Sequence, residues 1–177
     1  APVTTIRMAG LTLPDPGASR ETYTRAERVS VATLSLLAAL ALRLVSGDRS
    51  RHKVVLLDEA WFLLSSAQGR ALISRLVRLG RAMNATVLIA TQRLADLGDL
   101  AELIGTYFLF GQDSLAEAER GLELIGVEPE RAQRLAEYRR GRCLMRDLEG
   151  RVGEVQFDLV FPELLAALDT TPREAAA

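Results

Sequence analysis

Two adjacent carboxylates directly follow a run of aliphatic residues in the first third of the chain. Residues 54–57 are all valine or leucine, and Asp58 and Glu59 come next. A continuous aliphatic run is typical of a parallel strand that is buried on both faces. Ligands of open α/β folds bind at the carboxyl ends of such strands. For this segment alone, a strand that simply ends in acidic residues is an equally good interpretation.

Nucleotide hydrolysis would give the two carboxylates different tasks. Asp58 would hold Mg²⁺, usually through a bound water. Glu59 would orient and polarise the water that attacks the terminal phosphate. Their adjacency suits this chemistry, because the end of a strand can direct neighbouring side chains toward different targets.

A second aliphatic run, residues 86–90, ends in Thr91, Gln92 and Arg93. The amide of Gln92 carries both a donor and an acceptor, so it can bind a γ-phosphate oxygen and the attacking water together. An ordinary polar strand end is the alternative. Two strands that both end in groups suited to one site favour a nucleotide site.

Four arginines, Arg70, Arg75, Arg78 and Arg81, lie between these two strands. For Arg70 and Arg75 the expected setting is a solvated helix face. Arg81 lies just before the second strand and could act as an arginine finger on the nucleotide of a neighbouring subunit. A solvated position is the alternative for Arg81 as well.

Strand and helix patterns alternate around these residues. We expect a mostly parallel sheet with helices on both faces, an α/β fold, followed by an antiparallel hairpin. The expected strands are residues 3–11, 54–57, 86–90, 107–110, 142–148 and 151–159, and the expected helices are 24–44, 69–83, 97–104, 114–125, 130–138 and a short one from Pro162. Residues 1–177 are expected to form one domain with a loose tail at 170–177.

The composition excludes several classes of function. Hydrophobic residues make up 49% and charged residues 25%, which is typical of a folded, soluble domain. The net charge of −1 provides no overall attraction to nucleic acid. With one cysteine and one histidine, Cys143 and His52, the chain cannot form an internal disulfide or a Cys/His zinc site. His52 is expected to be a solvated surface residue.

Targeting signals are not evident in the sequence. The start shows no secretory pattern, and the longest uncharged apolar stretch, residues 29–42, is too short to cross a bilayer. We therefore expect no transmembrane segment in this chain, and a cytoplasmic location that allows docking at the inner face of the membrane.

A phosphate-binding loop is missing from the sequence. Such a loop needs a GxxxxGK[ST] pattern, and Lys53, the only lysine, has no glycine-rich segment before it. The expectation is a C-terminal part of a longer ATPase whose Walker A loop lies upstream. The chain alone would then be inactive, although the longer protein would hydrolyse ATP with Mg²⁺.

Three segments, VVLLDEAWFLL, RLGRAMNATVLIATQRL and TYFLFGQDS, occur in this order between about residues 25 and 159. Together they resemble the C-terminal ATPase domain of the conjugative-transfer, type IV secretion ATPases, which belong to the HerA/FtsK superfamily of RecA-like hexameric motors. The order of motifs is specific to the superfamily, and the choice of the conjugation branch depends on softer features such as DEAW.

The resemblance implies roles for individual residues. Asp58 and Glu59 would form the Walker B pair, and Gln92 would be the sensor glutamine. Arg81 would act across the subunit interface, although Ala82 stands where the superfamily often has lysine. Gln112 falls where the family often has a polar residue at a strand end, and could contribute to nucleotide binding.

The function implied by the resemblance is a hexameric Mg-ATP-dependent motor that powers type IV secretion or conjugative transfer, with secretion components and possibly DNA as partners. Two alternatives stay open. One is a HerA- or FtsK-like DNA translocase. The other is a nucleotide-free interaction module that keeps the RecA-like fold.

Overall fold

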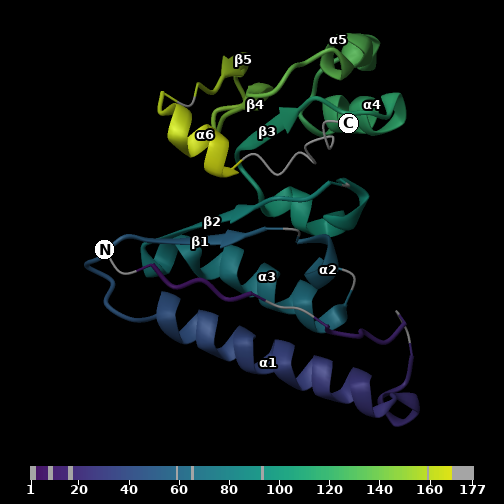
Figure 1. The fold of residues 1–177 in the computed structure, drawn as a ribbon, viewed down its shortest axis with the longest axis vertical. Helices are drawn as coiled ribbons and strands as arrows, with labels where there is room; N and C mark the ends of the chain where they lie inside the picture. The colour runs from purple at the N-terminus through teal and green to yellow at the C-terminus, as the bar shows by residue number, and fades with distance from the viewer. Residues whose placement is uncertain are drawn as a thin grey trace, which may run out of the picture. The chain divides into compact units, whose positions relative to one another are not determined.

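The computed structural model describes residues 3–7, 10–15, 18–58, 60–64, 66–92, 94–158 and 160–168. The chain divides into two units, Ala1–Ile104 and Gly105–Ala177, and each is described by itself (Figure 1). The assignment of residues 1–177 to a single domain stays a prediction. The expected tail at residues 170–177 lies outside the described part.

The first unit is built around two parallel strands. Strand β1 (Lys53–Leu57) pairs with β2 (Ala85–Ile89), in a register that runs from Lys53 opposite Ala85 to Leu57 opposite Ile89. Both aliphatic runs are therefore strands, as predicted. The connection contains α2 (Trp61–Leu64), α3 (Ala67–Gly80) and a 3-10 turn (Arg81–Met83).

Two glycines let α3 come close to its neighbours. A Cβ at Gly69 would lie 2.0 Å from the carbonyl oxygen of Leu63, and one at Gly80 would lie 2.9 Å from that of Ala85. Ser66 caps the helix, since its hydroxyl accepts the backbone N–H of Gly69 at 3.0 Å. Both ends of α3 therefore rest directly on the backbone of adjoining segments.

One apolar core holds the first unit together. Ile73 and Leu76 of α3 have no exposed surface. The core cluster also includes residues from α1, α2 and the 3-10 segments Leu94–Asp96 and Gly98–Leu103 that follow β2. Its buried members are Leu34, Ala60, Leu63, Leu64, Ile73, Leu97 and Leu100.

Helix α1 (Arg25–Val45), expected as a helix at residues 24–44, begins with a capping box. Glu27 accepts the backbone N–H of Thr24 at 2.6 Å, and the hydroxyl of Thr24 accepts that of Glu27 at 3.3 Å. A 3-10 turn, Arg20–Thr22, precedes it. The helix packs against α3 through its buried side, which includes Leu34.

The opposite side of α1 is apolar and open to solvent. Val29, Leu36 and Leu44 are 58%, 71% and 52% exposed. By length and mean hydropathy, 1.7, the 21-residue helix is apolar enough to cross a bilayer, whereas the uncharged stretch alone was judged too short. Core helices of soluble proteins pass the same test, so this finding alone assigns no membrane span.

The parallel sheet also differs from the expectation of two buried faces. Val54, Leu56 and Leu88 are 60%, 64% and 44% exposed, and burial alternates along both strands. The reason is that α3 covers one face, and no described segment of the first unit buries the other.

The prediction of a strand at residues 3–11 is wrong for the part that the structure describes. Residues 3–7 and 10–11 form no strand. The segment is held by α1 and the core instead. The backbone N–H of Thr12 donates to the hydroxyl of Ser30 at 2.9 Å, and Leu11 and Leu13 pack against the core cluster. The hydroxyl of Ser30 on α1 thus accepts a backbone N–H that a neighbouring strand would otherwise pair with.

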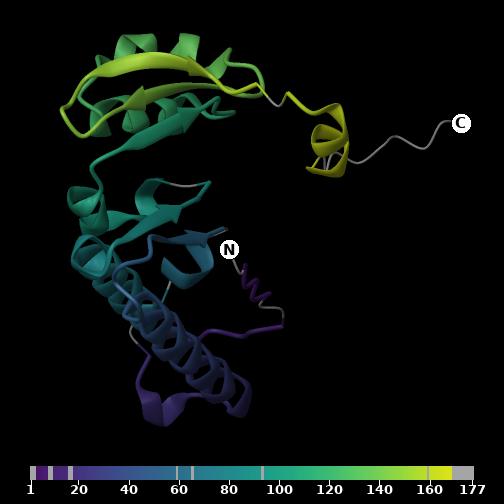
Figure 2. The same cartoon turned by 90° about the vertical axis from the view of Figure 1, so that its left-hand side faces the viewer.

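The second unit is an antiparallel sheet with helices. Strands β3 (Tyr107–Phe110), β4 (Arg142–Arg146) and β5 (Val152–Gln156) lie in the order β3-β4-β5 (Figure 2). The predicted hairpin is confirmed. The strand at residues 107–110 is confirmed as well, but it joins the hairpin and pairs antiparallel with β4.

The helices of the second unit are α4 (Leu115–Leu124), α5 (Ala132–Ala136), which follows a 3-10 turn at Pro129–Arg131, and α6 (Pro162–Leu168). Leu122 of α4 and Leu135 of α5 are almost completely buried. Leu109 of β3 and Leu144 of β4 lie opposite each other in the sheet and are buried too. These four leucines form the centre of the unit.

Candidate functional site

Asp58 and Gln92 follow the carboxyl ends of two paired strands. Asp58 comes directly after Leu57, and Gln92 lies three residues beyond Ile89, the register partner of Leu57. The pairing continues past the strands, because Ala90 donates its N–H to Leu57 and Ala60 donates its N–H to Ala90, both at 2.9 Å. The segments that carry Asp58 and Gln92 are therefore tied together at one edge of the sheet.

Glu59, the expected catalytic carboxylate, lies outside the described residues. Its neighbours are described: Asp58 is exposed, and Ala60 is completely buried in the core cluster. The chain thus passes from the open edge into the core within two residues.

Arg81 lies at the other edge of the sheet. It begins the 3-10 turn Arg81–Met83 between α3 and the start of β2, and it is exposed. The length of β2, five residues or about 16 Å, separates this turn from the edge with Asp58 and Gln92. The structure therefore does not bring Arg81 to the candidate site of its own chain.

Gln112 belongs to the second unit, two residues after β3 ends at Phe110. The residue is half-buried, and its side chain donates a hydrogen bond of 3.4 Å to the backbone carbonyl of Phe110. The prediction of a polar residue after a strand end holds, and its contribution to nucleotide binding stays a prediction.

A single carboxylate at an exposed strand end fits the usual way in which proteins hold Mg²⁺. That ion keeps several waters and takes one or two carboxylates together with substrate phosphates. Asp58 could be such a ligand through water, and the nearby amide of Gln92 could bind a phosphate oxygen.

Asp96 is a residue that the sequence reasoning missed. It ends the 3-10 segment Leu94–Asp96, four residues beyond Gln92. Its Oδ2 atom is buried and has no hydrogen-bond partner in the described structure. An orphaned buried carboxylate oxygen is costly and marks a strained or functional position. The available sequence signal was a lone acid in an otherwise apolar run, Leu94 to Leu97.

His52 was expected to be a solvated surface residue, and it is exposed, but its ring joins the two strands. Nδ1 lies 3.0 Å from Oδ1 of Asn84, and Nε2 lies 3.2 Å from the hydroxyl of Thr86. Because an amide oxygen only accepts, Nδ1 must donate. Asn84, at φ 51°, also donates from Nδ2 to the carbonyl of Arg49 at 3.1 Å. This network ties β1 to β2 at the edge opposite Asp58.

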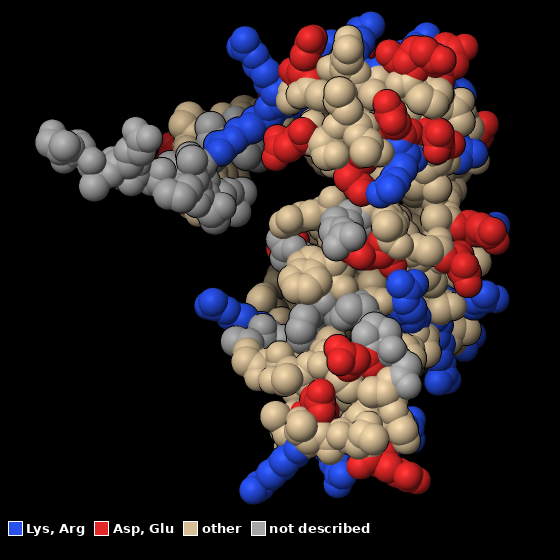
Figure 3. Space-filling view, turned by 90° about the vertical axis from the view of Figure 1, so that its right-hand side faces the viewer, with Lys and Arg blue, Asp and Glu red and all other residues tan. Residues whose placement is uncertain are grey.

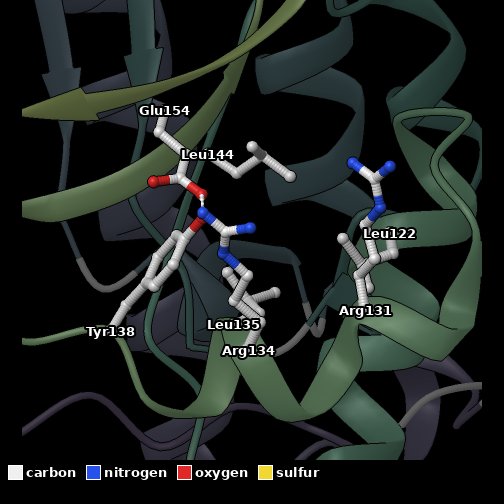
Figure 4. Close-up of a pocket in the computed structure, with 7 residues that line it drawn as sticks. All are labelled: Leu122, Arg131, Arg134, Leu135, Tyr138, Leu144 and Glu154. Atoms are coloured by element: carbon white, nitrogen blue, oxygen red, sulfur yellow. Dashed lines mark ion pairs between the residues drawn. The ribbon is translucent and has the colours of Figure 1, made fainter.

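The second unit contains a small cavity of about 30 Å³ between α4, α5 and the hairpin (Figure 4). Glu154 pairs there with Arg134 at 2.5 Å and with Arg142. The hydrogen bond from Arg142, aided by Tyr138, lowers the pKa of Glu154. A cavity of this size holds about one water, so it is too small for a nucleotide. The ionic cluster beside it connects α5 to the hairpin.

Charges of both signs are mixed on the surface. On the described part of the face in Figure 3, acidic and basic side chains alternate without forming a patch of one sign. This arrangement agrees with the net charge of −1 and provides no broad electrostatic surface for nucleic acid on that face.

Comparison with known proteins assigns the chain to a family. Residues 1–168 match the family described as an AAA-like domain. The chain belongs to this AAA-like family. The AAA-like chain is also similar to the uncharacterized protein YddE of Bacillus subtilis (strain 168), with 25% identity over 177 residues, which is 99% of this chain and 21% of that protein.

Among solved structures, VirB4 of Thermoanaerobacter pseudethanolicus is similar to this AAA-like chain, with a TM-score of 0.64 and 18% identity. The match covers 77% of this chain and 39% of that one. The chain thus spans a fifth of the length of one relative and less than half of the other. The findings confirm the predicted α/β class and the resemblance to the type IV secretion ATPases.

Proposed function

We propose that this AAA-like chain is the C-terminal part of a hexameric, Mg-ATP-dependent motor that powers type IV secretion or conjugative transfer. The observation that carries the proposal is the edge of the parallel sheet, where Asp58 and the segment of Gln92 are tied together in a chain of this family. The phosphate-binding loop would come from polypeptide outside residues 1–177.

Each residue has a task in this proposal. Asp58 holds Mg²⁺ through water, Glu59 polarises the attacking water, and Gln92 orients that water against the γ-phosphate. Arg81, on the opposite edge of the sheet from Asp58, acts on the nucleotide of the adjacent subunit. Gln112 adds a polar contact to the nucleotide. ATP is the substrate, and Mg²⁺ supplies charge neutralisation at the phosphates.

The proposed setting is the cytoplasmic side of the membrane, where the motor docks on type IV secretion components. DNA is a further proposed partner of the complete motor, although the described part of the face in Figure 3 provides no broad basic surface for it.

The experiment is a substitution in the intact motor. Glu59→Gln should lower ATP turnover by about 10²–10⁴-fold, because the water loses its general base, while Mg-ATP binding persists. The control is Glu130→Gln, which changes an exposed glutamate of the 3-10 turn at Pro129–Arg131 and should leave turnover unchanged.

Turnover by Glu59→Gln at the rate of the unmodified motor would contradict the role of Glu59. Calorimetry of Mg-ATP binding to the intact motor tests the alternative interpretation. If Mg-ATP binding were absent, the chain would be a nucleotide-free interaction module.

A further inference from the structure

One face of the antiparallel sheet in the second unit carries three exposed phenylalanines. Phe108, Phe110 and Phe157, which we call the aromatic face, are 42%, 45% and 50% exposed. The ring of Phe157 lies 5.8 Å from that of Phe108 and 6.1 Å from that of Phe110, between centroids. The three rings thus form one continuous apolar surface.

The aromatic face is the side of the sheet that the helices leave open. Leu144 and Glu154 point toward residues of α4 and α5 around the small cavity (Figure 4). Leu109 pairs with Leu144 and shares that side. Because side chains alternate along a strand, Phe108 and Phe110 point to the opposite side.

Helix α6 is apolar and lacks an extensive partner in the described chain. Phe161, just before it, and Leu164 within it are 62% and 49% exposed. Figure 2 shows α6 standing clear of the sheet, and no other described element packs extensively against it. A helix of seven residues is not stable by itself in water, so it needs an apolar surface to pack against.

We propose that α6 is an exchanged arm, which docks on the aromatic face of a second copy of this chain. Among the described side chains of the second unit, Phe161 and Leu164, just before and within α6, are exposed, and so are the three rings of the sheet face. Phe157, a ring of the face, lies only five residues before Pro162, the first residue of α6. In Figure 2, α6 lies away from the chain's own sheet.

Charge complementarity supports the same contact. The arm carries two carboxylates, Asp158 and Glu163. Arg139 is exposed in the turn before β4, and the N–H of Phe157 donates to the carbonyl of Gly141 in that turn at 2.7 Å. The acidic arm would therefore meet a basic side chain beside the aromatic face. The arm and the face are different surfaces of the chain. Two chains can therefore exchange arms with each other to form a closed dimer, or several chains can dock arm to face and form a ring.

The first test measures self-association of the 177-residue chain by analytical ultracentrifugation over a range of concentrations. The chain should associate, and Leu164→Glu should weaken association by about tenfold or more, because it places a charge in the apolar contact. Leu36→Glu, at an exposed leucine of α1, is the matched control and should not weaken it.

A mixing experiment identifies the partner surface. A Leu164→Glu chain keeps an intact face, and a Phe110→Glu chain keeps an intact arm, so each alone should be monomeric and their mixture should form a heterodimer. Circular dichroism of each variant establishes that it is folded. If the unmodified chain stays monomeric, if Leu36→Glu has the larger effect, or if the folded variants fail to associate when mixed, the exchanged arm is wrong.

This proposal does not require ATP hydrolysis, so its outcome is independent of the test on Glu59.

Discussion

At the scale of single residues, Gly69 shows how closely the first unit is packed. It lies in the first turn of α3, where an added Cβ would stand 2.0 Å from the carbonyl oxygen of Leu63 and 2.7 Å from the carbonyl carbon. These are backbone atoms, which cannot move as the end of a flexible side chain can. The junction of α2 and α3, which follows the candidate carboxylates, depends on the absence of a side chain there.

We expect Gly69→Ala to lower the free energy of unfolding by about 1–3 kcal/mol, the range for overpacked sites, although alanine favours helices. Urea unfolding followed by circular dichroism measures the change. Gly153→Ala in β5 is the control, because its added Cβ meets no atom within 4 Å, and its effect should stay within about 0.5 kcal/mol. Equal effects of the two substitutions would contradict the close contact at Gly69.

At the scale of elements, an ionic cluster connects α5 to the hairpin. Glu154 of β5 pairs with Arg134 of α5 and with Arg142 of β4, and the Arg142 guanidinium carbon lies 4.9 Å from the centroid of the Tyr138 ring. The hydrogen bond from Arg142 lowers the pKa of Glu154 below the ordinary value of 4.5. Burial is the largest cause that raises the pKa of Tyr138.

The cluster predicts a pH dependence of stability. Because the folded pKa of Glu154 is lower than the unfolded value, its contribution is fully present above about pH 4.5 and is lost as the pH falls through the folded pKa. Glu154→Gln should therefore be less stable than the unmodified chain at pH 7, and the difference should shrink below about pH 4. Urea unfolding at a series of pH values measures it.

The control for this prediction is Glu149→Gln at the tip of the hairpin. Glu149 pairs with Arg151 at 2.8 Å, but both side chains are largely exposed, and exposed pairs contribute little. A Glu154→Gln difference that stays constant from pH 3 to pH 7 would argue against an ionised Glu154 as the source of stability.

At the scale of the whole molecule, burial is uneven in the first unit. Leu76 of α3 is completely buried, whereas Leu56 of β1, on the open face of the sheet, is 64% exposed. Exposed apolar patches of soluble proteins mark interaction surfaces. The open face of this sheet, with Val54, Leu56 and Leu88, is such a patch.

Substitution of Leu76 and of Leu56 tests this uneven burial directly. In the 177-residue chain, Leu76→Ala should cost about 2–5 kcal/mol of unfolding free energy, because it leaves a cavity in the core. Leu56→Ala should change it by less than about 0.5 kcal/mol. Urea unfolding of both variants compares them, and similar losses would mean that the open face of the sheet is buried within the chain.

The positions of most elements were predictable from local patterns. The helix expected at residues 24–44 is α1, and its start depends on a local signal, a capping box between two residues only three apart. The aliphatic runs predicted β1 and β2, and their polar ends predicted that Asp58 and Gln92 would share an edge. These signals depend on side chains close in sequence, so one sequence is enough to recognise them.

Pairing partners and burial were decided only by the tertiary structure. Residues 107–110 were recognisable as a strand, but their antiparallel pairing with β4 joins residues more than thirty positions apart. Likewise, an aliphatic run indicates a strand suited to burial but does not determine which face is covered, as Leu56 shows. The orphaned oxygen of Asp96 and the ring of His52 between two strands also arise from contacts between distant segments. Local periodicity follows from neighbouring residues, whereas pairing and burial depend on which distant surfaces meet.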